Sequence, residues 1–110
     1  MIIKAPFTPT QVGAVSTVQL AWVAGFLEGE GCFSLAGKTP TCSANQVQQE
    51  PLLRLSQIFG GRLTLVPRRG RAQPIWSWRI VGQRAVEVML TLWTFMSPKR
   101  RSEIERAVTQ

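Results

Sequence analysis

The stretch VAGFLEGEG, residues 23–31, decides the fold of this chain. Its first five residues are apolar or small, and Glu28 and Glu30 follow, each succeeded by a glycine. An apolar helix that ends in carboxylates needs a compensating partner, because burying an unpaired charge is costly. A divalent cation is one such partner, since hard cations prefer oxygen ligands. The stretch therefore predicts a buried helix that presents a carboxylate at its C-terminal end.

The helix that contains this stretch is expected to begin at Thr17. Ser16 and Gln19 have the spacing of a capping box, which marks a helix N-terminus. The following residues leave almost no polar face, so the helix is too apolar to have one side in water. We expect it to pack against a copy of itself in a homodimer, where small residues allow close approach. The predicted contact residues are Leu20, Val23, Ala24, Gly25 and Leu27.

The rest of the chain reads as two hairpins and three further helices. Strand and turn signals predict hairpins over residues 32–47 and 62–81, and the helices are expected over 50–59, 83–94 and 98–108. Two antiparallel hairpins that form one sheet, with helices on its other face, make an α+β fold. Residues 1–16 are interpreted as an N-terminal arm, and residues 17–110 as a single domain.

Periodicity also predicts which side chains point inward. In the strand over 75–81, alternation places Trp76, Trp78 and Ile80 on one face, which we assign to the core. In the helix over 83–94, the residues expected to face inward are Ala85, Val86, Met89, Leu90 and Trp93.

Charge is the strongest compositional feature of the chain. Thirteen Lys and Arg stand against six acidic residues, which gives a net charge of +7. Seven arginines lie between Pro51 and Arg84 without one acid, and Lys99, Arg100 and Arg101 form a second cluster. This placement favours the phosphate backbone of a nucleic acid as the partner.

Several chemistries are excluded by what the chain lacks. It contains no His, Tyr or Asp, which excludes histidine-based nuclease chemistry, tyrosine recombination and zinc sites with His ligands. No apolar run is long enough to span a membrane, so no membrane partner is expected. Cys32 and Cys42 form no metal-ligand pair and are interpreted as reduced thiols. An intracellular, reducing compartment is therefore expected.

The stretch at residues 23–31 closely resembles the signature of the LAGLIDADG homing endonucleases. Residues 23–27 stand where that family has its helical residues, and residues 28–31 stand where it has acid, small, acid, glycine. The chain has Glu where the family more often has Asp. The resemblance implies the helix–hairpin–helix–hairpin–helix order, so it covers nearly the whole chain after Thr17. In that family the single-motif members act as homodimers on double-stranded DNA.

The resemblance also implies site residues. The second acid, Glu30, would hold a divalent cation, Mg²⁺ or another such as Mn²⁺, with the backbone near Gly29 helping. A polar residue after the first hairpin matches Gln46, with Gln48 as the competing register. A basic residue before the last helix matches Lys99. Glu30, Gln46 and Lys99 are therefore the predicted catalytic residues, and Glu28 is expected to be structural.

The face of the sheet opposite the core is expected to read DNA, because a two-stranded ribbon fits the major groove. Alternation and loop position select the candidate contacts, of which some would touch only phosphate. They are Ser34, Lys38, Arg62, Thr64, Arg68, Arg69, Arg71, Gln73, Ser77 and Arg79, with Arg100 added from the second basic cluster.

These observations predict a homodimeric, metal-dependent endonuclease that makes a double-strand break at a near-palindromic DNA site. Two alternatives stay open at this point. The chain could be a non-cleaving binding protein on the same fold, either a maturase that binds intron RNA or a DNA-binding regulator. It could also be an endonuclease that the replacement of Asp by Glu has made slow.

Overall fold

The chain folds as predicted into alternating helices and hairpins. The structure, a computed structural model, describes residues 15–70 and 73–109, so all of the predicted N-terminal arm except Val15 and Ser16 lies outside the described residues. The elements are α2 (Thr17–Glu30), β1 (Gly31–Ala36), β2 (Thr39–Gln46), α3 (Glu50–Phe59), β3 (Arg62–Val66), β4 (Ile75–Val81), α4 (Gln83–Leu92), the 3-10 turn η1 (Trp93–Phe95) and α5 (Pro98–Val108). None of the helices in this described part is long and apolar enough to cross a membrane.

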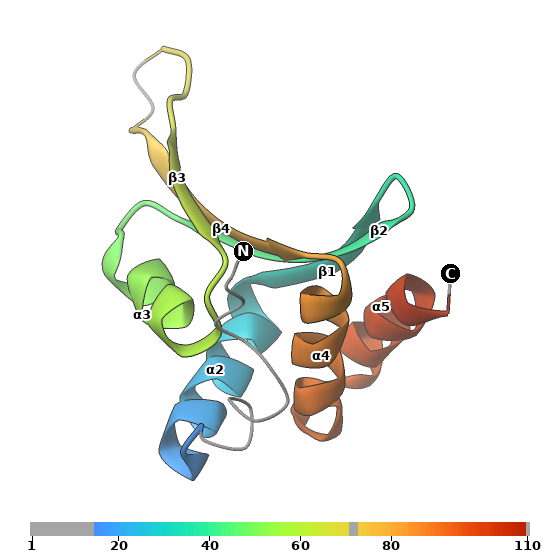
Figure 1. Cartoon of the computed structure of the whole chain (residues 1–110). Coiled ribbons are helices and arrows are strands. Elements are labelled where there is room, and N and C mark those ends of the chain that lie inside the picture. The colour runs from blue at the N-terminus through green and yellow to red at the C-terminus, as the bar shows by residue number, and fades with distance from the viewer. Residues whose placement is uncertain (1–14, 71–72, 110) are drawn as a thin grey trace.

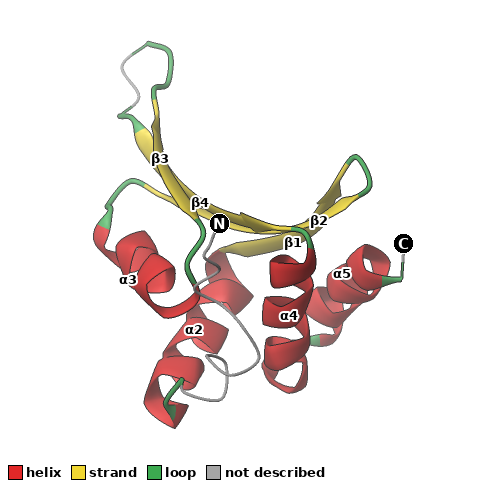
Figure 2. Cartoon of the chain, in the orientation of Figure 1, coloured by secondary structure: helices red, strands yellow, loops and turns green. Residues whose placement is uncertain are grey.

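The four strands form one antiparallel sheet in the order β1-β2-β4-β3. The second hairpin therefore joins the first through β4, which pairs with β2 from Thr41 opposite Val81 to Gln46 opposite Trp76. Figure 1 and Figure 2 show all the helices on one face of this sheet, while the ends of both hairpins rise on the other side. The predicted α+β fold is confirmed, and the open face of the sheet is concave.

The core lies between the sheet and the helices. Trp78 and Ile80 of β4 are buried as predicted, and Phe33, Cys42 and Ala44 join them from β1 and β2. Both cysteines are free thiols, of which Cys42 is buried and Cys32 is exposed. The indole of Trp78 donates a hydrogen bond of 2.8 Å from Nε1 to the carbonyl oxygen of Gly60, so its one polar atom is satisfied inside the core.

The turn from α3 into β3 requires two glycines. Gly60 and Gly61 have φ angles of 78° and 100°, which side chains rarely adopt. A Cβ on Gly61 would also lie 2.7 Å from Nε1 of Trp78. The predicted end of the helix at these glycines is confirmed, and the close approach to Trp78 explains why the second one must lack a side chain.

The inward face of α4 differs from the prediction. Ala85, Val88, Met89 and Leu92 are buried, whereas Leu90 is 57% exposed. The prediction was right for Ala85 and Met89 but wrong for Leu90, because it selected the neighbouring stripe of the same helix. The N–H of Gly82, which precedes α4, donates to the carbonyl oxygen of Pro40 in β2 at 2.8 Å and so attaches the start of the helix to the sheet.

Candidate functional site

The candidate site is built around the point where α2 becomes β1. The helix begins with the predicted capping box, in which Ser16 and Gln19 exchange two hydrogen bonds of 3.0 Å. It ends at Glu30, and Gly31 starts the strand with no loop between them. Gly31 is buried, and a Cβ there would lie 2.7 Å from the carbonyl oxygen of Leu27. This close passage holds the exposed side chain of Glu30 at the junction between helix and sheet.

The two acids of the motif have different surroundings. The carboxylate of Glu28 accepts a hydrogen bond of 2.8 Å from the backbone N–H of Ser97, which precedes α5. That hydrogen bond holds the pKa of the Glu28 carboxyl below its ordinary value, and the positive charges of Arg100 and Lys99 act in the same direction. Glu28 is thus engaged within the chain, whereas Glu30, the last residue of α2, is exposed.

Gln46 lies at the same end of the sheet as Glu30. The register places Gly31 opposite Ala44, so Gln46, two residues further along β2, passes beyond the start of β1, at the end of the sheet where α2 joins β1. Its side chain is half-buried and, by alternation with Ala44, is on the helix-covered face. The competing candidate, Gln48, is exposed in the bend that leads to α3. The register therefore favours Gln46 as the residue near the junction.

Lys99 is brought to the same place from the other end of the chain. It is exposed in the first turn of α5, which Ser97 caps by accepting a hydrogen bond of 3.3 Å from the N–H of Arg100. Because Glu28 is hydrogen-bonded to Ser97, two residues before Lys99, and to Arg100, directly after it, the start of α5 lies against the end of α2. The predicted catalytic residues Glu30, Gln46 and Lys99 thus come from three elements that meet at the end of α2; their roles stay predictions.

One chain offers few ligands for a metal ion. Among residues 15–70 and 73–109, no group of three or more His, Cys, Asp and Glu could hold one. The available donors are oxygens, namely the carboxylate of Glu30 and the carbonyl of Gly29, one of the last four carbonyls that a helix leaves without an intrahelical partner. Such a donor set fits a hard cation such as Mg²⁺, which keeps several waters and takes other ligands from phosphate.

The open face of the sheet carries polar and basic side chains and no acid. Register aligns Cys32, Ser43, Arg79 and Arg62 in one row across all four strands. A neighbouring row consists of Asn45, Ser77 and Thr64. All six acidic residues lie in helices, outside this face. The concave face is therefore positively charged, as binding to a polyanion requires.

The predicted DNA contacts fall into three groups. Ser34, Arg62, Thr64, Ser77 and Arg79 lie on the open face, and Lys38 is exposed in the turn between β1 and β2. Arg68, Arg69 and Gln73 are exposed in the loop between β3 and β4, where Nε of Arg68 donates to the carbonyl oxygen of Gln73 at 2.6 Å. Arg71 lies outside the described residues.

Arg100 and β2 differ from what the sequence suggested. The side chain of Arg100 is only 12% exposed, and its guanidinium donates to the carbonyl oxygen of Glu28 at 3.0 Å and pairs with Glu103 at 2.9 Å. It is thus held inside the chain. Ser43 and Asn45 of the central strand β2 lie on the open face but were not selected. The alternation of Cys42 and Ala44 in the core was the signal that would have identified them.

The predicted dimer face of α2 is largely used within the chain. Val23, Ala24 and Leu27 are buried in its own core, and Leu20 packs partly against that core. On another side of the helix, Trp22 stacks on Phe26, and the guanidinium of Arg54 from α3 lies 4.2 Å from the Trp22 ring centroid. Of the five predicted contacts only Gly25 is exposed. It belongs to an open stripe that consists of Val18, Ala21, Gly25 and Gly29.

The chain is similar in structure to homing endonucleases. It matches the homing endonuclease I-CvuI, solved in complex with the I-CreI target in the presence of 2 mM Mg, with a TM-score of 0.60 and 19% identity. A second I-CvuI structure, solved in complex with its target in the presence of 2 mM Ca, matches with a TM-score of 0.60 and 20% sequence identity. In both, 80% of this chain matches 62% of that chain, so the likeness spans less than two thirds of I-CvuI.

A third similar structure is the homing endonuclease I-TnaI, with a TM-score of 0.56 and 19% identity over 82% of this chain and 69% of that one. By sequence, no protein-family model matches the chain, and neither does any curated protein. At these identities the likeness shows the fold, which is that of the homing endonucleases.

Proposed function

We propose that this chain is a metal-dependent DNA endonuclease of the homing type, which acts as a homodimer on a near-palindromic duplex. The observation that carries the proposal is the placement of Glu30. An exposed carboxylate stands where α2 continues directly into β1, an edge strand of the positively charged sheet, and pure binding of a polyanion would gain nothing from a negative charge there. A cation between the carboxylate and a phosphate gives that position a use.

The residues at the junction divide the work of phosphodiester hydrolysis. Glu30 and the carbonyl of Gly29 would hold a divalent cation, which supplies charge stabilisation and a more acidic water when bound. Lys99 would place a positive charge near the scissile phosphate. Gln46 has an amide that can orient the attacking water by hydrogen bonding. Hydrolysis breaks one phosphodiester on each strand.

Two copies are needed because one chain provides one such carboxylate. The open stripe of α2 is made of small residues at Ala21, Gly25 and Gly29, which allow two helices to approach closely, and Val18 adds exposed apolar surface. Pairing α2 with its copy brings two Glu30 side chains together and makes the site symmetric. The longest dimension of the chain, 41 Å, corresponds to about 12 base pairs of duplex, which limits each half-site.

The experiment that tests the function uses a randomised duplex library. The protein is incubated with it in Mg²⁺ or Ca²⁺, and cut and retained fractions are sequenced for the natural chain and for Glu30→Gln. We expect Mg²⁺-dependent cuts at a near-palindromic site, and retention without cutting for Glu30→Gln. Specific retention in both metals with no cutting by the natural chain would indicate a binding protein instead. Equal loss of cutting and retention in Glu30→Gln would refute the role of Glu30.

A further inference from the structure

We propose that Glu28 is a positioning residue, which fixes the backbone around Lys99 relative to Glu30 by completing the cap of α5 from α2. The inference rests on the proposed function, because Lys99 and Glu30 are the reacting groups of that function. It assigns to the first acid of the motif a task separate from the metal role of the second.

Two polar contacts join the last turn of α2 to the start of α5, and two more lie within the start of α5 itself. The backbone N–H of Ser97 donates to the Glu28 carboxylate at 2.8 Å, and Nε of Arg100 donates to the carbonyl oxygen of Glu28 at 3.0 Å. Within α5, the N–H of Arg100 donates to Oγ of Ser97, and the guanidinium of Arg100 pairs with Glu103. We call these contacts the Glu28–Ser97–Arg100 clasp.

The clasp is a capping box whose acid comes from another helix. In a local capping box, the residue three positions after the cap carries a Glu or Gln that accepts the N–H of the cap residue. Gln19 does this for Ser16 at the start of α2. In α5 the equivalent position is Arg100, which cannot accept a hydrogen bond. Glu28 supplies the missing acceptor across 69 residues of sequence.

The partial charges at the two helix ends favour the position of Glu28 between α2 and α5. A carboxylate at the C-terminal end of a helix is unfavourable, and a carboxylate at an N-terminal end is favourable. Glu28 lies at the C-terminal end of α2 and also at the N-terminal end of α5, so its charge is compensated only when α5 begins at this place. The contact therefore selects one position for α5 against α2.

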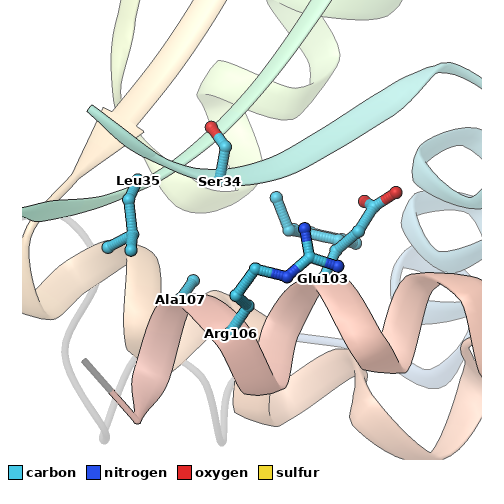
Figure 3. Close-up of a pocket in the computed structure, with 6 residues that line it drawn as sticks. Ser34, Leu35, Glu103, Arg106 and Ala107 are labelled. Atoms are coloured by element: carbon cyan, nitrogen blue, oxygen red, sulfur yellow. The ribbon is translucent and has the colours of Figure 1, made fainter. Parts of the chain in front are cut away.

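Lys99 lies inside the clasp. The residue two before it and the residue after it are both bonded to Glu28, so its backbone is fixed while its exposed side chain remains available for phosphate. Further along, α5 packs against β1. A pocket of about 240 Å³ lies between parts of the two elements and is lined by Phe33, Ser34, Leu35, Glu103, Arg106 and Ala107. Figure 3 shows Leu35 directed toward α5 and Ser34 directed away from it.

The test is a double-mutant cycle on single-turnover cleavage at saturating duplex. Misplacing a reacting group by about 1 Å can cost about 10²-fold, so Glu28→Ala should slow cleavage by about that factor while the dissociation constant for DNA stays within a few-fold. Glu28→Gln retains an oxygen that can accept the Ser97 N–H, and it should recover most of the rate. In a Lys99→Ala background, Glu28→Ala should add little, because both act through one group.

Two outcomes would overturn the proposal. Glu28→Ala could slow cleavage by the same factor with and without Lys99, which would mean that it acts elsewhere. Glu28→Gln could be as slow as Glu28→Ala, which would mean that the hydrogen bond accepted from the Ser97 N–H is not what positions Lys99. If the alanine variant does not fold, Glu28→Gln still decides, since the positioning role requires it to cleave.

A second measurement is independent of cleavage. Amide hydrogen exchange of Arg100 and Arg101, in the first turn of α5, should become faster in Glu28→Ala and stay unchanged in Glu105→Ala, an exposed acid on the same helix. Unchanged exchange in Glu28→Ala would contradict the clasp itself. Absence of any cleavage by the natural chain would contradict the proposed function. The exchange result would then still test whether Glu28 fixes the start of α5.

Discussion

Arg62 of β3 and Arg79 of β4 lie directly opposite each other on the open face of the sheet. Like charges in such a cross-strand pair are destabilising, and no acidic residue lies in any strand to offset them. A folded sheet that keeps this pair on its open face is suited to a polyanionic partner. The same pair supplies two guanidinium groups, each able to read a guanine in the major groove.

We expect Arg79→Ala to relax base preference at one position of each half-site. An arginine that contacts guanine contributes about 1–3 kcal/mol of discrimination, which binding to duplexes with single base changes would measure. Arg106→Ala is the matched control, because Arg106 is exposed on α5, on the helix-covered side. Equal weakening on all duplexes would assign Arg79 to phosphate, and equal effects of both variants would argue against this face.

The labelling rate of Cys32 can report whether DNA covers the proposed interface, and no substitution is needed. Cys32 stands in the same row as Ser43, Arg79 and Arg62 and is exposed, whereas Cys42 is buried and its burial raises the pKa of its thiol. We expect N-ethylmaleimide to label Cys32 quickly and Cys42 slowly, and bound duplex to slow the labelling of Cys32 several-fold. Mass spectrometry of the labelled chain measures both. Undiminished labelling of Cys32 in the complex would place the DNA elsewhere.

Gly25→Leu should separate association from folding. Gly25 has nothing within 4 Å of a built Cβ, so a side chain fits within one chain. In a close helix pair the same side chain overpacks the contact, which costs about 1–3 kcal/mol and should raise the dimer dissociation constant roughly 5- to 150-fold. Sedimentation equilibrium measures it, with Gln57→Leu on the exposed side of α3 as control. A natural chain that is monomeric at all concentrations and on DNA would refute the dimer.

The sequence predicted the elements well because their signals are local. Period-two alternation identified the core face of β4 through Trp78 and Ile80, and the capping box at Ser16 and the glycines after α3 marked helix ends. Each of these depends on neighbours within a few residues.

The features that could not be predicted from the sequence depend on contacts between distant segments. An all-apolar α2 is compatible with a dimer seam and with a buried core helix, and only the packed sheet shows that Val23 and Leu27 are used inside the chain. The partner of Glu28 could not be found either. Ser97 is 69 residues away from Glu28 in the sequence. Arg100 occupies the position where a local capping box would have Glu or Gln, so the local sequence contains no sign of the acceptor.

The close passage at Gly61 predicts a large loss of stability for Gly61→Ala. The residue has a φ of 100°, and a Cβ would lie 2.7 Å from Nε1 of Trp78 and 2.9 Å from the carbonyl oxygen of Arg79. Backbone strain alone costs about 1–3 kcal/mol, and the clash adds to it. Gly37→Ala is the matched control, since Gly37 has a φ of 66° but open space around it. If both variants lost the same free energy of unfolding in urea, Trp78 would have to move away from the added Cβ without any loss of stability.

The stability of the chain should depend on pH through Glu28. The hydrogen bond from the Ser97 N–H depresses the pKa of this carboxyl in the folded state below its ordinary value of 4.5. A group with a depressed folded pKa stabilises the fold above its unfolded pKa, and that contribution is lost as the pH falls through the folded value. The difference in free energy of unfolding between the natural chain and Glu28→Gln should therefore shrink as the pH is lowered from about 6 to about 3. Glu105→Gln, in an exposed position on α5, serves as the control. A difference for Glu28→Gln that stays constant over this range would mean that the carboxylate is not favoured by Ser97 in the folded chain.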